Sequence, residues 1–112
     1  MPPYHVYEIV YDPYQLAGMM QSLRRDGVVY VKEMIQSGPR LTADRKLYDM
    51  IVSGRLSHMG DWRLREHIQN SRAKTQKDEE SKLRITKKAP HRHIDLAVAA
   101  SMAVSEALRL NL

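Results

Sequence analysis

The chain has 112 residues, of which 43% are hydrophobic and 28% are charged, a composition typical of one globular domain rather than of a disordered chain. It contains no cysteine, which excludes a disulfide framework and a thiolate metal site and suits a reducing cytoplasm. No apolar run approaches the roughly 20 residues of a membrane-spanning helix, and the first residues lack a signal-peptide pattern. The formal net charge of +5 favours a polyanionic partner.

The first third of the chain predicts a strand, a helix and a second strand. Residues 4–11 are rich in β-branched and aromatic side chains and predict a strand buried on both faces. The helix that follows has Asp12 as its N-cap, Pro13 in its first turn and Gly27 at its end. Residues 28–35 predict the second strand, so the two strands should pair in parallel as a βαβ unit. Apolar residues at helical spacing, expected to face the core, are Leu16, Met19, Met20 and Leu23.

From residue 37 onward the pattern predicts mainly helices. Thr42 should cap a helix that Gly54 ends, and Asp61 should cap another helix over residues 62–74. Residues 75–81 are polar and predict a mobile segment, and residues 82–86 predict a short strand. The last helix, from Ile94 to about Leu110, is apolar almost all the way round and rich in small residues, so it should pack closely against a sheet.

These elements predict an α/β fold in which a parallel βαβ unit is combined with helices packed on a small sheet. We expect one domain over residues 1–112, with the βαβ unit in residues 1–36. A helical insertion should occupy residues 37–78, and a short strand and the C-terminal helix residues 79–112. The sequence has no phosphate-cradling glycine loop and no paired-histidine zinc motif, which disfavours an ATPase, a dinucleotide enzyme and a zinc site.

Two acids stand at positions where a metal site is conceivable. Asp12 follows the first strand of the parallel unit, at the sheet edge where α/β proteins bind ligands. Asp95 opens the last helix between Ile94 and Leu96, where a buried carboxylate would be costly. If both acids meet at one edge, their oxygens suit Mg²⁺ or Mn²⁺. Each acid also has a structural explanation, since an N-cap contributes about 1 kcal/mol and a helix-dipole contact about 0.3–1 kcal/mol.

Five short motifs run through nearly the whole chain in the order found in one known family. The sequence resembles the C-terminal half of the nuclease domain of the tailed-phage terminase large subunit, as found in phages and prophages. The motifs that carry this resemblance are VYDPYQLAGMMQSLRRDG, VVYVKEMIQSGPRLT, GRLSHMGDWRLREHIQN, LRITKK and HIDLAVAASMA.

The resemblance implies an RNase H-like fold, of which this chain would be the C-terminal half. It implies cleavage of concatemeric viral double-stranded DNA during genome packaging, with two divalent ions, Mg²⁺ or Mn²⁺. It places two metal-binding, catalytic aspartates of the family on Asp12 and Asp95. The implied partners are double-stranded DNA, the small terminase subunit and the portal, in the cytoplasm of a bacterial host and without a membrane.

The resemblance also suggests roles for further polar residues. The family's lysine before the last helix matches Lys87, which we expect to contact phosphate. The complete set expected to guide DNA is Lys87, Lys88, Arg92 and Arg40. Three matched residues are expected to support the site, namely Gln36 after the second strand, His58 in a loop and Asn70 at a helix end.

One departure from the family concerns the metal site. The family's first metal-binding aspartate would precede all residues of this sequence, and Glu8 cannot replace it, since it lies four residues, or about 13 Å, before Asp12. We therefore expect an incomplete site, as in a fragment, a split gene or a relative that no longer cuts. An open sheet edge should also favour self-association. A non-catalytic module that binds DNA or docks a packaging partner remains an alternative, as does another RNase H-like DNA enzyme, such as a transposase or resolvase.

Overall fold

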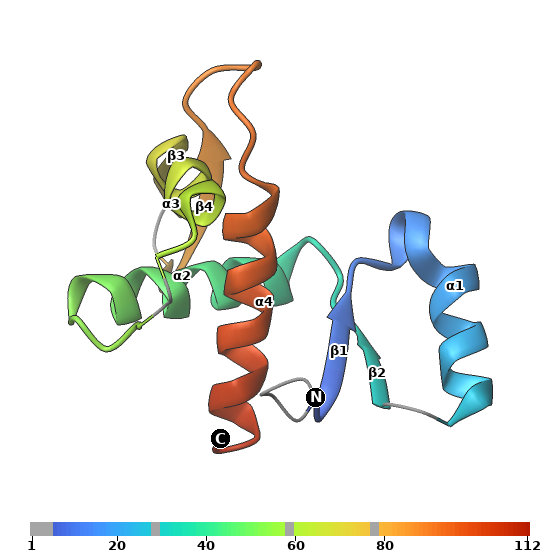
Figure 1. Ribbon diagram of the computed structural model, residues 1–112. Helices are drawn as coiled ribbons and strands as arrows, with labels where there is room; N and C mark the ends of the chain where they lie inside the picture. The colour runs from blue at the N-terminus through green and yellow to red at the C-terminus, as the bar shows by residue number, and fades with distance from the viewer. Residues whose placement is uncertain (1–5, 28–29, 58–59, 77–78) are drawn as a thin grey trace.

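The computed structural model describes residues 6–27, 30–57, 60–76 and 79–112. Figure 1 shows a strand–helix–strand region on one side of the C-terminal helix and a region of helices and a hairpin on the other. The elements within the described ranges are β1 (Glu8–Tyr11), α1 (Pro13–Asp26), β2 (Tyr30–Glu33), α2 (Gly38–Val52), α3 (Trp62–Gln69), β3 (Ser71–Gln76), β4 (Glu79–Lys87) and α4 (Asp95–Arg109). The predicted α/β class is confirmed.

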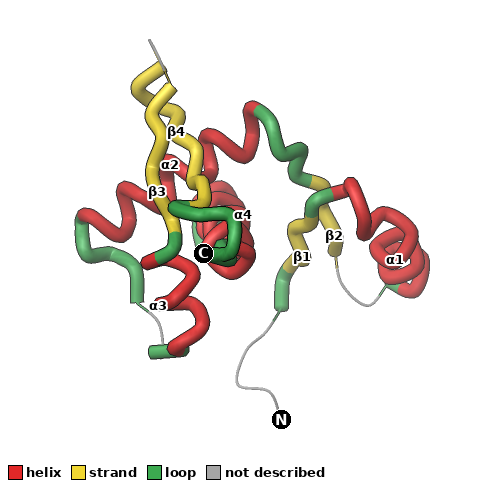
Figure 2. Tube along the Cα trace, turned by 90° about the horizontal axis from the view of Figure 1, so that it is seen from above, coloured by secondary structure: helices red, strands yellow, loops and turns green. Residues whose placement is uncertain are grey.

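The strands β1 and β2 pair in parallel, from Glu8 opposite Tyr30 to Tyr11 opposite Glu33, which confirms the predicted βαβ unit. The prediction that the first strand is buried on both faces is wrong for its described residues. Only Tyr11 is buried in β1, and Tyr30 of β2 is 81% exposed. The reason is the narrow sheet: two strands with α1 and α4 on either side leave both edges open (Figure 2).

Helix α1 starts and stops where local signals predict. It begins at Pro13, and Gly27 follows its end with a φ of 67°, a conformation that glycine adopts without a steric penalty. The predicted inward stripe is only partly correct. Met20 is buried, but Leu16 is 39% and Met19 62% exposed. Since α1 packs mainly against β2, its partner is too narrow to cover the whole stripe.

Helix α2 begins earlier than expected. Its N-cap is Ser37 and Pro39 lies in its first turn, whereas Thr42 lies inside the helix and donates its hydroxyl to the carbonyl of Gly38. A proline in the first turn costs no hydrogen bond and favours this early start. The end agrees with the prediction, because Gly54 follows the helix with a φ of 70°.

Helix α3 is capped by Asp61, as predicted, since its carboxylate accepts hydrogen bonds from the N–H groups of Arg63 and Leu64. The helix ends at Gln69, and the residues after Asn70 form β3 instead of continuing to residue 74. Strand β3 pairs antiparallel with β4, which contains the predicted strand over residues 82–86. Residues 71–76 are a strand because pairing with β4 satisfies their backbone groups, which local propensity does not reveal.

The main core lies between α2, β4 and the start of α4. Its buried members are Leu47, Leu83, Ile85 and Ile94, and the partly buried side chains around them are Leu56, Val98, Ala100 and Val104. Helix α4 packs mainly against α2 and α3, so the prediction that it packs closely against a sheet is wrong for its main contacts.

A buried ion pair on α2 covers the outer edge of β4. Arg40 donates to the carbonyl of Ile85 at 2.9 Å, and the Ile85 N–H donates to Asp44 Oδ2 at 2.9 Å. Arg40 Nε lies 3.3 Å from the same carboxylate oxygen, and Asp44 is fully buried. The two side chains thus replace a neighbouring strand and protect an otherwise open edge.

Charged side chains join the parallel strands to α4. Lys32 Nζ lies 2.9 Å from a carboxylate oxygen of Glu106, and Arg109 lies 4.0 Å from Glu8. Arg109 also contacts Glu106. Burial raises the pKa of Glu106, but hydrogen bonds from Lys32 and Arg109 more than offset this effect and leave the pKa below its usual value. The carboxylate therefore stays ionised at the junction.

Candidate functional site

The opposite directions of β1 and α4 point the segments that carry Asp12 and Asp95 the same way. Arg109, at the end of α4, lies beside Glu8 at the start of β1, so the helix and the strand run in opposite directions. The carboxyl end of β1 and the amino end of α4 consequently face the same side, the upper side in Figure 1. Asp12 directly follows β1 and Asp95 is the first residue of α4.

Gln36 marks one point at which α4 lies against the segment that follows β2. Its Nε2 atom donates to the carbonyl of Met34 at 2.9 Å and lies 3.5 Å from the sulfur of Met102. Asp95 precedes Met102 by seven residues, which corresponds to about 10 Å of helix. The first two turns of α4 therefore extend past the level at which Gln36 meets the helix.

The environments of the two acids differ. Asp12 is half-buried, and the carbonyl of the preceding Tyr11 accepts a hydrogen bond from the Met34 N–H at 2.8 Å. Asp95 is exposed, although Ile94 before it is buried. The burial cost expected from the apolar neighbours of Asp95 does not arise, because the first helical turn directs this side chain to the surface.

The donor atoms at this end of the molecule suit a hard cation only in part. Carboxylate oxygens of Asp12 and Asp95 are the ligand type that Mg²⁺ and Mn²⁺ prefer. Within residues 6–27, 30–57, 60–76 and 79–112, however, no three His, Cys, Asp or Glu side chains gather closely enough to hold a metal ion. The described residues alone therefore do not form a complete metal site.

The amino end of α4 is held by α3. His67 Nδ1 accepts a hydrogen bond from the Leu96 N–H at 2.9 Å. Ile94, the N-cap residue, has no side-chain hydrogen bond to the helix, so His67 supplies the acceptor that the first turn needs. This geometry requires an unprotonated Nδ1. Sequence reasoning missed His67, because 29 residues separate it from its partner and no local pattern links them.

Asn70 ties the same region together. Its side-chain amide donates to the carbonyl of His93 at 3.0 Å, and its Oδ1 atom accepts from Arg92 at 3.4 Å. Its backbone carbonyl accepts from the Lys88 N–H at 2.9 Å. Through these contacts Asn70 holds the loop before α4, and this is how it would play the expected supporting role. The third expected supporting residue, His58, lies outside the described residues.

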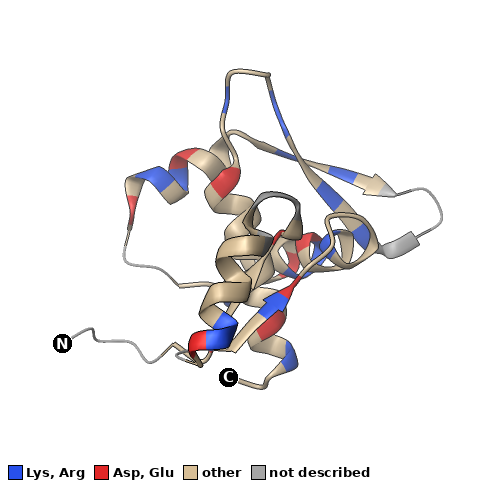
Figure 3. Ribbon diagram, turned by 90° about the vertical axis from the view of Figure 1, so that its right-hand side faces the viewer, with Lys and Arg blue, Asp and Glu red and all other residues tan. Residues whose placement is uncertain are grey.

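Of the cations expected to guide DNA, Lys87, Lys88 and Arg92 are exposed at the end of β4 and in the loop before α4. Figure 3 shows basic positions along the hairpin and this loop. Arg40 differs, because it is only 8% exposed and its guanidinium is engaged by Ile85 and Asp44 inside the fold. A guanidinium in that position cannot reach the phosphates of a duplex, so we assign Arg40 a structural role in place of the expected DNA contact.

These features define an α/β domain with two acids at one end and exposed cations near them. Residues 2–110 match the family described as "Terminase large subunit, endonuclease domain", and since the match spans nearly the whole chain, the protein belongs to this family. The membership implies interaction with DNA. No curated protein and no solved structure gives a match. None of the helices in the described residues is long and apolar enough to cross a membrane.

Proposed function

We propose that this chain is the C-terminal portion of an RNase H-like nuclease domain that cleaves concatemeric viral double-stranded DNA during genome packaging. The observation that carries the proposal is the family match over residues 2–110. The parallel pairing of β1 with β2 and the opposite direction of α4 support it. The family match also favours a terminase over a transposase or a resolvase.

In this proposal Asp12 and Asp95 are the carboxylates that bind divalent ions. When bound, Mg²⁺ or Mn²⁺ would activate water and stabilise the leaving oxygen of the phosphodiester. The chain itself holds the start of α4 in place, because His67 accepts a hydrogen bond from the N–H of Leu96, the residue after Asp95. The exposed Lys87 contributes a positive charge for DNA phosphate at the end of β4.

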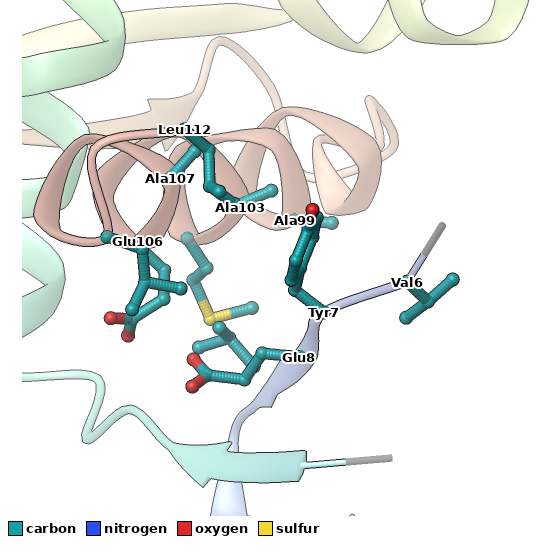
Figure 4. A pocket seen from close by; sticks show the side chains of 11 residues that line it. Val6, Tyr7, Glu8, Ala99, Ala103, Glu106, Ala107 and Leu112 are labelled. Carbon is teal, nitrogen blue, oxygen red and sulfur yellow. The ribbon is translucent and has the colours of Figure 1, made fainter. Parts of the chain in front are cut away.

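The described residues hold no cluster of three metal ligands, so the proposal requires further ligands from residues outside the described ranges or from another polypeptide. An apolar pocket of about 280 Å³ lies between β1 and α4 and receives side chains from both (Figure 4). Val6 and Tyr7 beside it are well exposed, and Glu8 Oε1 is buried without a hydrogen-bond partner among the described residues. An added strand at β1 would cover this surface. A second copy of the chain is the alternative occupant of this surface. Sedimentation at rising protein concentration tests it, since self-association would shift the protein from monomer to dimer.

The proposed ligands are tested by titrating Mn²⁺ into isotope-labelled protein and recording backbone amide signals. Broadening is expected around Asp12 and Asp95 and should disappear in Asp95→Asn. The control is Asp49→Asn on α2, which removes an exposed acid away from the two acids and should leave the broadening unchanged. Diffuse broadening over the whole surface would contradict the assignment of these two ligands.

A non-catalytic DNA-binding or packaging-partner module is the second candidate. It is favoured by the observation that the described residues hold no cluster of three metal ligands. A supercoiled-plasmid assay with the complete nuclease domain separates the two functions: a nuclease converts the plasmid only with Mg²⁺ or Mn²⁺ and loses this activity in Asp95→Asn. A binding module leaves the plasmid intact and binds it equally well with or without a chelator. The small terminase subunit and the portal remain proposed partners.

A further inference from the structure

The β3–β4 hairpin has one cationic face and one face in the core. Lys74 pairs directly with Arg84. Because direct partners share a face and residues alternate along each strand, Arg72, Lys74 and Arg84 lie on the same side of the hairpin. These three residues are called the cationic face below. The opposite side carries Leu83 and Ile85 of β4, both buried in the core, so β4 is anchored from behind, whereas Ala73 of β3 on that side is exposed.

Basic side chains gather in the part of the hairpin away from Glu79 and Glu80, the acids at the start of β4. The stretches 71–75 and 82–87 contain five lysines and arginines and no acid. Arg72 and Lys74 are exposed, and Arg84 is half-exposed. Directly opposed like charges, such as Lys74 and Arg84, normally destabilise a strand pair. An anionic partner lying on the exposed side would offset this repulsion.

The cationic face adjoins the end of the molecule that carries the two acids. Arg84 donates to the carbonyl of Gln36 at 3.2 Å. Gln36 follows β2 at the sheet edge where Asp12 follows β1. At the far end of β4, the exposed Lys87 and Lys88 continue the positive charge toward the loop before α4. A polyanion lying on the cationic face would thus extend to the proposed metal-binding end.

We propose that Arg72, Lys74 and Arg84 bind the phosphate backbone of double-stranded DNA and align it with the proposed cleavage site. A two-stranded β-ribbon is narrow enough to enter the major groove, and basic side chains on its surface contact phosphates without reading sequence. The inference rests on the proposed function, to which it adds a DNA-binding surface. The competing explanation is that charges on an exposed strand merely prevent edge-to-edge pairing of two molecules, in which case DNA binding does not depend on them.

The test measures duplex binding by the full chain in a chelator, so that cleavage plays no part. The affinity for a fluorescently labelled duplex is recorded by anisotropy at salt concentrations from about 50 to about 200 mM. In Arg72→Gln/Lys74→Gln, the slope of log K against log salt should become shallower by about 1.8, or about 0.9 for each lost phosphate contact. Arg72→Lys/Lys74→Arg keeps both charges and should retain the slope of the unaltered chain.

The matched control removes two charges elsewhere. Arg24→Gln/Arg25→Gln changes two exposed residues in the last turn of α1 and should leave the slope unchanged. Equal losses in the two Gln variants would mean that only net charge matters and would overturn the proposal. Equal thermal unfolding of all variants confirms that the fold is intact.

The two proposals fail in different ways. An unchanged slope in Arg72→Gln/Lys74→Gln would overturn the role of the cationic face and leave metal-dependent cleavage untouched. Normal duplex binding without Mn²⁺ broadening around Asp12 and Asp95 would refute the proposed metal ligands and leave the cationic face standing. Absence of duplex binding by the unaltered chain at about 50 mM salt would overturn both.

Discussion

The βαβ unit and the rest of the molecule are built in different ways. The region formed by α2, α3, the hairpin and α4 surrounds an apolar core that includes Leu47 and Leu83. The βαβ unit has narrow, half-exposed strands and a helix whose Leu16 and Met19 remain in solvent. Apolar burial is thus more extensive in the first region than in the βαβ unit. The pair formed by Lys32 and Glu106 connects them.

This difference matters for the proposed site. Asp95 starts a helix that is anchored in the core, whereas Asp12 follows a strand of the less buried βαβ unit. A site that uses both acids therefore depends on the charged junction between the regions as much as on either region alone. The predictions below separate the contributions of the core, of the junction and of the helix end.

Loss of the buried carboxylate on α2 should have the largest effect. Asp44→Ala leaves Arg40 buried without its ionic partner and removes the acceptor of the Ile85 N–H, so the free energy of unfolding should fall by about 3–5 kcal/mol. Urea unfolding measures this change. The control Asp49→Ala breaks the exposed pair with Arg45 on the same helix and should cost less than about 1 kcal/mol. Equal costs would contradict the edge-covering role of the buried pair.

A truncation in the core should cost more than a truncation in the βαβ unit. Leu83→Ala removes a fully buried side chain of β4 and should lower the free energy of unfolding by about 3 kcal/mol. Leu16→Ala on α1 removes a side chain that is 39% exposed and should cost about 1 kcal/mol or less. If Leu16→Ala proves as costly in chemical denaturation as Leu83→Ala, the two regions are packed equally well.

The junction should weaken in acid. The pKa of Glu106 is lower in the folded chain than in the unfolded chain, so its carboxylate stabilises the fold above the unfolded pKa. That contribution is lost as the pH falls below 4.5 and through the folded pKa. Glu106→Gln should lower the free energy of unfolding by about 1 kcal/mol near pH 7 and by almost nothing near pH 3. The effect at pH 7 is modest because Lys32 and Arg109 are partly exposed to solvent. A cost independent of pH in urea unfolding would refute the ionic role.

Loss of the hydrogen bond at the start of α4 should have the smallest effect on stability. His67→Ala removes the acceptor of the Leu96 N–H and should cost about 0.5–1 kcal/mol, as does the loss of an N-cap. Amide hydrogen exchange at Leu96 should become faster, while exchange in the core stays unchanged. His91→Ala, at an exposed position nearby in the sequence, is the control. Unchanged exchange at Leu96 in His67→Ala would show that the cap does not hold α4.

Sequence reasoning succeeded where neighbouring residues decide the structure. Asp61 caps α3, and Gly27 and Gly54 follow helix ends with positive φ, because an N-cap and a left-handed turn involve only a few consecutive residues. The parallel pairing of β1 and β2 was also predictable, since a strand, a helix and a strand with short connections leave little choice.

Of the candidate site, the sequence and the family resemblance proposed Asp12 and Asp95 as ligands and Asn70 as a supporting residue, and these roles stay predictions. It did not reveal that Arg40 is buried or that His67 caps α4, because both facts depend on partners far along the chain. Residues 71–74 were predicted to continue the helix, because the pairing with β4 that makes them part of a strand is not visible in the local sequence.

The sequence by itself determined the positions of most helix ends, the βαβ order and the terminase family to which the chain belongs, because these are written in short-range patterns and motif order. Tertiary structure alone decided which apolar faces are covered, which arginine is buried and which histidine closes the start of α4. The physical reason is that burial and hydrogen-bond partners depend on which surfaces meet in space, and distant segments supply those surfaces.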